Sequence, residues 1–401
     1  MDNNKRLAIL CSDDQCTGCM ACVNACHQDS LSAGINEEGY YRPNLDAEKC
    51  IKCNLCEKSC PILNPPARNK VEEIKVYAAW HLNDEIRARS SSGGAFTALA
   101  EAMLAKGGVV YGAAWGERLI VEHIGVSEKQ GLEKLRLSKY AQSRVGDAMK
   151  KVKEHLIRGK EVLFVGTPCQ TAGLKSFLSK DYDNLIVVDF ICHGVPSIKF
   201  LGKYSDWLEN KTGRIEKINF RDKRKGWYDN LRVATNEKGR DKVLKGKDDC
   251  YWVAFNNNNN LQLSCYQCVA QGFPRVSDIT IADFWGVGKK VPFGHKEEIE
   301  KGVSLVVVNN AKGEALFNEA KGSLFIEERT IEEAIGGNIA GVKSSLKPVI
   351  RDTIYRDMDK MDFDTFRMKY MKTSLKQDLV KIFRERLPYG IVKWVRLKSQ
   401  R

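Results

Sequence analysis

Long apolar runs are missing from this sequence of 401 residues. No stretch approaches the ~20 consecutive apolar residues that a membrane-spanning helix requires. The first ten residues, MDNNKRLAIL, also lack the apolar core of a signal peptide. We therefore expect a cytoplasmic chain without a membrane span, in a reducing environment that keeps its 14 cysteines available as metal ligands.

The common nucleotide-binding and nucleic-acid-binding motifs are absent as well. The chain has neither the Gly-Lys-Ser/Thr of a Walker loop nor a G-x-G-x-x-G loop, and the second absence argues against NAD(P)H as an electron donor. No zinc finger, DNA-binding helix pair or RNA-binding signature accompanies the net charge of +13. We therefore expect no nucleic-acid partner.

About half of the positive excess lies in one segment. Residues 351–401 contain 14 Lys or Arg but only 7 Asp or Glu. We predict a basic helical tail over residues 346–401, and a solvated helix surface is the simplest explanation of its charge. Docking of an acidic electron carrier is the alternative explanation.

What the chain does have is patterned cysteine near its N-terminus. Two runs have the spacing C-x2-C-x2-C-x3-C, and Pro61 follows the second run. This spacing is typical of bacterial ferredoxins with two 4Fe–4S clusters. The eight cysteines are Cys16, Cys19, Cys22, Cys26, Cys50, Cys53, Cys56 and Cys60.

The spacing also predicts which cysteines share a cluster. Three cysteines two residues apart wrap a turn of backbone around one cubane, and the fourth lies beyond that turn and ligates the other cluster. The two ligand sets are Cys16, Cys19, Cys22 and Cys60, and Cys50, Cys53, Cys56 and Cys26. Zinc and disulfides are the alternatives, but a third cysteine at this spacing fits a structural zinc site poorly. Cys11 lies outside the pattern and is expected to be a spare thiol.

Residues 1–66 are thus predicted to form a small dicluster ferredoxin module. Gly39 and Pro43, between the two cysteine runs, indicate a short hairpin. A module of this size has little apolar core, so its clusters would supply most of its stability. Prolines 61, 65 and 66 indicate the linker that ends it.

Beyond Ile74 the pattern changes to that of a larger α/β domain. KVYAAWHL alternates as a strand, the Ser/Gly-rich loop RARSSSGGA follows, and a helix is predicted near Phe96–Lys106 before the strand VVYGAAW. Free N–H groups and the helix dipole at such a loop favour an anion, so phosphate or flavin binding is one interpretation. A capped helix start with Ser92 as the N-cap is the other.

Two later strands each run into a cysteine. EVLFVG precedes Cys169 and LIVVDF precedes Cys192, and both strands have the apolar texture of a parallel sheet, whose ligands gather at the carboxyl edge. Cys265 and Cys268 form a further C-x2-C pair. Four thiols from three loops are enough for a third 4Fe–4S cluster, and zinc or a redox-active disulfide at the pair are the alternatives.

Three further segments are polar or aromatic. Residues 132–146 contain the donor-rich stretch LRLSKYAQSRVG, and most such stretches are surface turns. Phe220–Tyr228 places cations among aromatics; an exposed hairpin is expected there, with stacking or an anion contact as the alternative. Asp278–Gly286, DITIADFWG, alternates as a strand.

These ordered motifs resemble the coenzyme F420 hydrogenase/dehydrogenase beta-subunit family. The resemblance rests on SSSGGAFTALAEAM, GGVVYGAAW, LRLSKYAQS, GTPCQTAGLKSFL, DFICHGVPS, FRDKRKGW, CYQC and DITIADFWG. It implies an N-terminal region over residues 72–155 and a C-terminal region over residues 156–345. The fold class is then α+β or α/β: a dicluster ferredoxin module, a mixed α/β flavin-binding reductase domain and a basic helical tail. One departure is that no Arg-Pro precedes Cys265.

The resemblance also implies a set of cofactor residues. Members are flavin- and iron–sulfur-containing reductases, which makes Cys169, Cys192, Cys265 and Cys268 the ligands of a third cluster beside FAD. Lys139 or Tyr140 would supply a proton to the substrate, although a binding role is favoured. The residues expected to contact FAD are Ser91, Ser92, Gly93, Gly94, Ala95, Lys139, Tyr140, Gln142, Ser143 and Thr167.

The function implied is electron transfer between a low-potential carrier and a substrate. The carrier would be a ferredoxin-like protein or the deazaflavin coenzyme F420, although the family name does not fix F420. Electrons would pass through the N-terminal clusters and the third cluster to FAD. The substrate, a small molecule or a protein, and the oligomeric state are not readable from the sequence. The alternative is an electron-relay subunit of a larger redox complex, without a reaction of its own.

Overall fold

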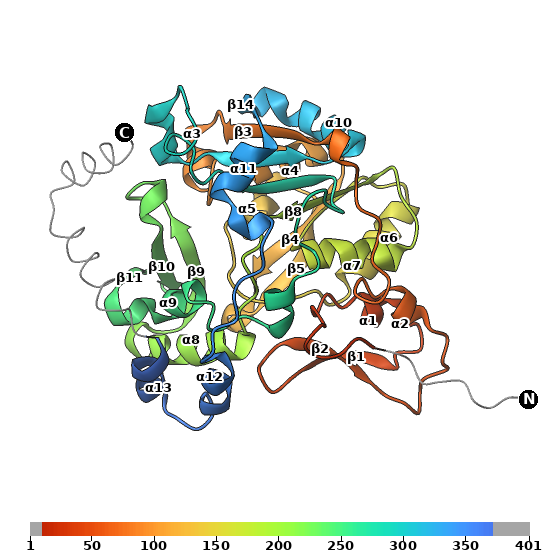
Figure 1. Ribbon diagram of the computed structural model, residues 1–401, viewed down its shortest axis with the longest axis vertical. Helices are drawn as coiled ribbons and strands as arrows, with labels where there is room; N and C mark the ends of the chain where they lie inside the picture. Colours follow the sequence, from red (N-terminus) through yellow and green to blue (C-terminus); the bar gives the residue numbers. More distant parts are fainter. Residues whose placement is uncertain (1–9, 372–401) are drawn as a thin grey trace, which may run out of the picture.

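The computed structural model describes residues 10–371, and residues 1–9 and 372–401 lie outside the described part. Figure 1 shows three parts: an N-terminal module (residues 10–66), a main domain around a nine-stranded sheet, and a smaller three-stranded sheet with helices beside it. Within the described range, no helix is both long and apolar enough to cross a lipid bilayer.

The N-terminal module contains the predicted hairpin. Its strands β1 (Leu31–Ile35) and β2 (Tyr41–Leu45) pair antiparallel, and Gly39 adopts a φ of 82° in the turn between them, a conformation that favours glycine. Helices α1 (Ala21–Ala25) and α2 (Leu55–Lys58) carry parts of the two cysteine runs. The module's own buried cluster consists of Cys26, Leu31 and Cys56, so its apolar core is small, as the sequence predicts.

The main domain is built on a mixed sheet with the strand order β14-β3-β13-β12-β8-β7-β4-β5-β6. These strands are β3 (Lys75–His81), β4 (Val109–Trp115), β5 (Val121–Val126), β6 (Ser143–Arg144), β7 (Val162–Val165), β8 (Leu185–Phe190), β12 (Ile279–Asp283), β13 (Ser304–Val308) and β14 (Leu324–Arg329). The mixed α/β fold and its principal strands are therefore confirmed. Strands from both of the predicted regions, residues 72–155 and residues 156–345, enter this one sheet.

The centre of the sheet is parallel. Strand β7 pairs parallel with both β4 and β8, and β8 pairs parallel with β12. Since β7 and β8 are neighbours, the segments that follow them leave the sheet at the same edge. Cys169 and Cys192 lie in these segments, as expected for a site at the carboxyl edge of parallel strands.

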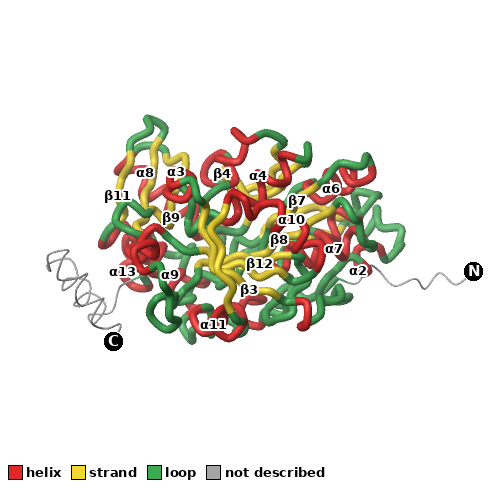
Figure 2. Tube along the Cα trace, turned by 90° about the horizontal axis from the view of Figure 1, so that it is seen from above, coloured by secondary structure: helices red, strands yellow, loops and turns green. Residues whose placement is uncertain are grey.

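Helices cover both faces of this sheet (Figure 2). Side chains alternate between the faces along each strand: Leu163 packs with α4 (Ala95–Ala105) and α10 (Ala311–Ala320), whereas Val162 and Phe164 pack with the opposite layer. The opposite layer includes α6 (Ala148–Ile157) and α7 (Pro168–Leu178). Three short helices, α3 (Asp84–Ala88), α5 (Leu132–Leu135) and α11 (Ile331–Gly337), lie in the connections.

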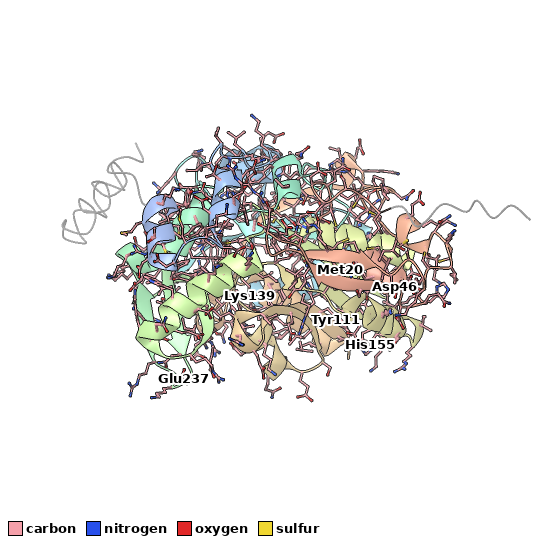
Figure 3. The ribbon with its side chains drawn as sticks, turned by 90° about the horizontal axis from the view of Figure 1, so that it is seen from below. Met20, Asp46, Tyr111, Lys139, His155 and Glu237 are labelled. Atoms are coloured by element: carbon pink, nitrogen blue, oxygen red, sulfur yellow. The ribbon has the colours of Figure 1, made fainter. Side chains whose placement is uncertain are left out.

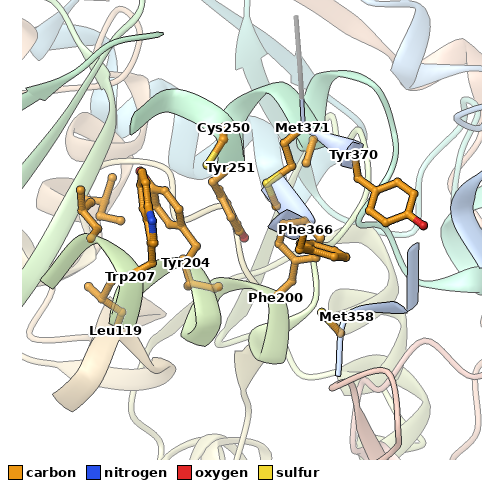
Figure 4. Close-up of a cluster of buried hydrophobic side chains, with 14 of the residues drawn as sticks. Leu119, Phe200, Tyr204, Trp207, Cys250, Tyr251, Met358, Phe366, Tyr370 and Met371 are labelled. Atoms are coloured by element: carbon orange, nitrogen blue, oxygen red, sulfur yellow. The ribbon is translucent and has the colours of Figure 1, made fainter. Parts of the chain in front are cut away.

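A second core lies beside the main sheet (Figure 4). Its strands are β9 (Ile215–Asp222), β10 (Leu231–Asn236) and β11 (Asp241–Leu244), and its helices are α8 (Ile198–Thr212), α9 (Cys250–Asn256), α12 (Arg351–Asp357) and α13 (Phe363–Tyr370). Phe366 of α13 is 1% exposed in this core. The start of the predicted basic tail is therefore packed and helical, and its residues 372–401 lie outside the described residues.

The segment Phe220–Tyr228 corrects one expectation. It does connect two antiparallel strands, β9 and β10, but only Arg224 and Lys225 at its tip are exposed. Phe220 and Trp227 are 1% and 0% exposed. The reason is tertiary: the aromatic side chains of this hairpin pack into the second core and against the strand end at Asp283, which the local sequence does not reveal.

Candidate functional site

The four cysteines of the main domain line one pocket: Cys169, Cys192, Cys265 and Cys268. Cys169 lies in the first turn of α7, which begins with a capping box at Thr167 and proline at the next position. Cys192 follows β8, and the C-x2-C pair lies on the short turn that starts at Leu263. The fold thus brings together all four thiols that the sequence suggested for a third cluster.

Burial and mutual repulsion govern these four thiols. Burial raises the pKa of Cys169 to about 11 and that of Cys265 to about 12. The pKa of Cys192 is raised by burial and then by the charges of the other three sulfurs. Cluster formation requires deprotonated thiols and would relieve this repulsion, because the irons balance the thiolate charge.

Two of the four sulfur atoms also lie beside hydrogen-bonding groups, as ligands of an iron–sulfur cluster commonly do. The backbone N–H of Val195 donates to the Cys265 sulfur at 3.3 Å, and the Thr167 hydroxyl lies 3.1 Å from the Cys169 sulfur. Such donors tune the reduction potential of an iron–sulfur cluster. The residues present therefore fit a 4Fe–4S cluster. Within residues 10–371, no group of three or more Cys, His, Asp or Glu side chains is arranged to hold a single metal ion.

The N-terminal cysteines also lie in two groups that match the ligand sets suggested by their spacing. One pocket is lined by Cys26, Cys50, Cys53 and Cys56. In the other group, burial and the charges of Cys16 and Cys60 raise the pKa of Cys22 to about 12. Burial and the charges of Cys22 and Cys16 likewise raise that of Cys19.

Cys11 lies beside the first of these groups, a position that the sequence did not reveal. Its thiol is hydrogen-bonded to Cys16 and Cys60 and lowers their pKa values to about 7 and about 6. The C-x2-C spacing describes one turn of backbone and carries no information on where the preceding residues fold. The free thiol is thus in contact with two expected ligands rather than remote from them.

The N-terminal module meets the main domain at these cysteines. A Cβ atom added to Gly173 would lie 2.8 Å from the Cys19 sulfur, so the thiol rests directly on the backbone of α7. Gly173 is one helical turn beyond Cys169. Thr17, from the first cysteine run, lines the four-cysteine pocket. The first ligand set of the module therefore lies next to the third set.

Gln142, expected to contact FAD, is occupied with the N-terminal module. Its side-chain oxygen accepts a hydrogen bond of 2.7 Å from the Tyr41 N–H. A Cβ atom on Gly18 would lie 2.3 Å from its side-chain nitrogen, which leaves room only for glycine there. Nearby, Ser143 accepts a hydrogen bond of 2.8 Å from Gln170 of α7. Both residues thus support the junction between the module and α7.

The Ser/Gly loop contacts the other segment expected to bind flavin. The Ser138 N–H donates to the Ser91 hydroxyl at 3.0 Å. Ser92 as the N-cap of α4 is wrong, because the cap is Gly94, two residues later, and the Ser92 hydroxyl donates to the Val303 carbonyl. Gly93 packs on the sheet, since a Cβ atom there would lie 2.4 Å from the Ala79 carbonyl oxygen.

The start of α4 has no capping side chain of its own. Gly94 supplies none, and the first turn, which begins at Ala95, has no acidic residue. The Ala95 N–H donates to the Ser304 hydroxyl at 3.5 Å, but no carboxylate in this turn neutralises the positive end of the helix dipole. With the Ser91–Ser138 contact beside it, this loop fits a phosphate-bearing cofactor such as FAD.

Lys139, a suggested proton donor, is engaged with the backbone. Its ammonium group donates to the carbonyls of residues 134, 135 and 136 at 3.0, 3.0 and 2.6 Å. Burial lowers its pKa to about 7. All three N–H groups are used at the end of α5, so the side chain stabilises this turn. Figure 3 labels Lys139 and, in the N-terminal module, Met20.

Tyr140 sits in an aromatic group. Its ring centroid lies 5.3, 5.0 and 4.9 Å from those of Phe220, Trp252 and Phe255. Burial raises its pKa. Tyr140 therefore connects the stretch LRLSKYAQS to the second core, and its hydroxyl keeps its proton at neutral pH.

Two polar residues at this site were not identified from the sequence. Arg221 of β9 and Asp283 at the end of β12 form an ion pair of 2.9 Å. Arg221 lies in the motif FRDKRKGW and Asp283 lies in DITIADFWG. No local pattern in either motif indicates that the two side chains meet. Their contact depends on the packing of the small sheet against the large one.

Comparison with protein families agrees with this site. The family described as "Coenzyme F420 hydrogenase/dehydrogenase, beta subunit" matches in two parts, its N-terminal part at residues 76–150 and its C-terminal part at residues 159–334. Together these make up more than half of the chain. The chain belongs to this family. The description "4Fe-4S dicluster domain" matches residues 15–63. The protein therefore has an oxidoreductase-type domain with an iron–sulfur dicluster domain in front of it.

Comparison with solved structures includes a distant likeness. A chain of the F420-reducing [NiFe] hydrogenase complex from Methanosarcina barkeri, in a xenon-derivatised structure, is 18% identical with a TM-score of 0.44. The alignment covers 76% of this chain and 91% of that chain. No curated protein matches the sequence.

Proposed function

We propose that this member of the family is an iron–sulfur flavoprotein oxidoreductase. It would pass electrons between a low-potential carrier and a substrate. When bound, 4Fe–4S clusters supply single-electron steps and FAD supplies the change to a two-electron reaction. Everything else is the work of this chain's residues, which hold, space and insulate those groups.

One observation carries the proposal: the contact between the N-terminal module and the four-cysteine pocket. Thr17 lines that pocket, and Cys19 rests on Gly173, one turn from Cys169. This arrangement supports a path for electrons from the first ligand set to the third without a movement of the module. The second ligand set includes the exposed Cys53, which suits exchange with a carrier at the surface.

The Ser/Gly loop and its neighbours would hold FAD. Ser91 and the positive end of the α4 dipole would contact its phosphates, and Thr167 lies beside Cys169 at the end of β7. Tyr140 would form an aromatic wall rather than act as an acid, because burial raises its pKa and makes loss of its proton less favourable. Lys139 would act through the turn that it stabilises, since its donors are occupied.

The carrier in this proposal is a ferredoxin-like protein or coenzyme F420. The fourteen free cysteines fit a reducing compartment such as the cytoplasm. The substrate is an unidentified small molecule or protein.

The test is the cofactor content of anaerobically purified protein, with iron, zinc and released flavin measured per chain. We expect about twelve irons and one FAD, from three cubane clusters and one flavin. About eight irons with FAD would remove the third cluster. A protein without flavin after reconstitution would overturn the reductase proposal and favour a relay subunit, which should co-purify with a catalytic partner and have no turnover of its own.

A cysteine substitution sharpens this test. Cys192→Ala should lose about four of the twelve irons, because a cubane with three protein ligands is poorly retained. Cys250→Ala is the matched control, since Cys250 is 1% exposed but lies in the second core, apart from the pocket. Equal iron content in the two variants would show that Cys192 holds no cluster.

A further inference from the structure

The ion pair of Arg221 and Asp283 is fixed from several sides. The Arg221 Nη1 atom lies 2.9 Å from one oxygen of Asp283, and the other oxygen accepts a 2.8 Å hydrogen bond from the Trp227 indole. The Arg221 guanidinium lies over the Trp285 ring at 4.9 Å, and Trp285 is stacked on Trp227 with centroids 4.8 Å apart. The guanidinium plane therefore has one defined orientation.

This buried guanidinium stays charged. Its side chain is only 5% exposed. Burial opposes the charge, but the attraction of Asp283 and of the Tyr140 hydroxyl outweighs it and raises the pKa of Arg221. A permanent cation is thus held inside the protein, where each unpaired N–H group carries a desolvation cost.

One edge of the Arg221 guanidinium has no well-aligned partner. Its Nε and Nη2 atoms are buried, and neither has a well-aligned acceptor within residues 10–371. The Tyr140 hydroxyl lies close enough to the guanidinium to interact with it, and it is the one neutral oxygen beside this cation that the pKa shift involves. These two N–H groups point in parallel from the same side of the plane. That edge matches the two oxygens of a carboxylate or a phosphate, which it binds with two parallel hydrogen bonds.

Other buried arginines use this edge within the chain. Arg232, on the neighbouring strand β10, donates from Nε and Nη2 to the two oxygens of Asp249. The same two atoms of Arg87 donate to the Gly302 carbonyl, and those of Arg351 donate to the Leu261 carbonyl. Unlike these three arginines, Arg221 has no well-aligned acceptor from residues 10–371 at this edge.

Arg221 is connected to both parts of the proposed redox site. Tyr140, beside the guanidinium, contacts Phe255, whose ring lies 4.9 Å from that of His193 in the four-cysteine pocket. Just past the end of β9, the Lys223 ammonium donates to the Ser92 carbonyl of the Ser/Gly loop at 2.6 Å. Arg221 is thus linked through Tyr140 and Phe255 to the four-cysteine pocket, and through the neighbouring Lys223 to the Ser/Gly loop.

We propose that the Nε/Nη2 edge of Arg221 binds the oxyanion, a carboxylate or a phosphate, of a small molecule at the redox site. The inference deepens the proposed function, on which its choice of ligand rests. Two sources have this chemistry: the phosphates of the flavin itself, and an acidic group of the acceptor. In both cases Asp283 and the tryptophan stack hold the arginine ready, and no proton or electron moves through it.

The experiment compares the wild-type holoprotein with Arg221→Lys and Arg232→Lys. Lysine at position 221 keeps a charge for Asp283 but has no two-donor edge, and position 232 is the control because Asp249 already fills its edge. Flavin affinity is measured on reconstitution. The thermal unfolding midpoint is then followed during titration with inorganic phosphate and, separately, benzoate.

Two results would support the proposal and identify the source. If the flavin phosphates use the edge, Arg221→Lys should bind FAD at least about tenfold more weakly than wild type or Arg232→Lys. If an acidic acceptor uses it, Arg221→Lys should keep its FAD affinity but need at least about tenfold more phosphate or benzoate for the same stabilisation. Should Arg221→Lys not fold, the double variant R221Q/D283N removes both charges together and should show the same losses.

Unchanged FAD affinity together with an unchanged anion response in Arg221→Lys would overturn the proposal. A wild-type protein that binds no flavin would instead overturn the reductase function. In that case the anion titration of the flavin-free protein still tests Arg221, because the edge belongs to the chain. A flavin-free protein that responds equally with arginine or lysine at position 221 would overturn both.

Discussion

The N-terminal module and the main domain are stabilised in different ways. In the main domain, central strands are buried on both faces: Val306 and Val307 of β13 are each 0% exposed although they point in opposite directions. The module's own buried cluster is only Cys26, Leu31 and Cys56. Burial of apolar surface thus accounts for the main domain, whereas the module depends on its cysteine ligands and on its neighbours.

The neighbours of the module are specific. The Tyr40 hydroxyl, at the end of the hairpin turn, lies 2.6 Å from the Tyr355 hydroxyl and donates to the Asn260 carbonyl at 2.8 Å. Glu38 pairs with the buried Arg351 of α12. The hairpin turn of the module is therefore bonded to the second core, while Cys19 at its other end packs against α7. A module held at both ends is suited to fixed electron transfer and not to a swinging one.

Removal of iron should have the largest effect on stability. It should destabilise the module and leave the main domain folded. Chelation under anaerobic, reducing conditions should unfold residues 10–66, because most of the module's stability would come from its clusters. The main sheet should persist, because its core consists mainly of apolar side chains from its own strands and covering helices, with Cys19 at the edge of one layer. Limited proteolysis with mass spectrometry checks this: cleavage sites should appear within the module and not within the strands of the main sheet.

The same digestion on the iron-loaded protein is the control. It should leave the module intact, since both ends are docked. Rapid cleavage throughout the main sheet after chelation would show that the two regions unfold as one unit, and the contrast in their stabilisation would then be wrong.

The contrast also explains what could be predicted from the sequence. The strands β3, β4, β7, β8 and β12 were predictable because strands of a packed sheet need apolar residues, in a short run or alternating, between breakers. The hairpin of the module was predictable from its turn residues. These signals are local, since they depend on residues close together in the chain.

The candidate site was predictable only where its chemistry is local as well. Cysteine spacing suggested two ligand sets because one turn of backbone encloses a cubane. The contact of Cys11 with Cys16 and Cys60, and that of Gln142 with the module, depend on how distant segments pack. The meeting of Arg221 with Asp283 is of this second kind. The family resemblance pointed to the right segments but could not say which of their side chains are already occupied.

The second largest effect is expected at acidic pH, which should lower the free energy of unfolding of the main domain. His123 of β5 is 7% exposed, lies 3.2 Å from the Val165 carbonyl through Nε2, and has its pKa lowered to about 4 by burial. An unfolded histidine titrates near 6.5, so between pH 6.5 and 4 the unfolded chain binds more protons and the free energy of unfolding falls as pH falls. Above pH 6.5 histidine is neutral in both states and contributes no slope.

At pH 5 this linkage should cost the main domain about 2 kcal/mol. Urea unfolding of wild type and His123→Gln at pH 7.5 and pH 5 measures it, and the variant should lose less stability on acidification. His27→Gln, which replaces an exposed histidine of the module outside the main domain, is the matched control. An equal acid response in wild type and His123→Gln would show that this buried histidine does not govern it.

The smallest expected effect tests the junction between the regions. Gly173→Ala adds a methyl group where only 2.8 Å separates the Cβ position from the Cys19 sulfur. Overpacking of this kind costs about 1–3 kcal/mol, which outweighs the gain of up to about 1 kcal/mol from replacing a helical glycine. Gly202→Ala is the matched control, since position 202 is also helical but its Cβ would meet nothing within 4 Å.

Thermal unfolding should therefore move in opposite directions in the two variants. Gly202→Ala should be slightly more stable than wild type, and Gly173→Ala less stable, with faster proteolysis in the proline-rich linker as the module loosens. If Gly173→Ala gained stability as Gly202→Ala does, Cys19 would not rest on α7. The close contact between the first and third cysteine sets, on which a fixed electron path depends, would then be lost.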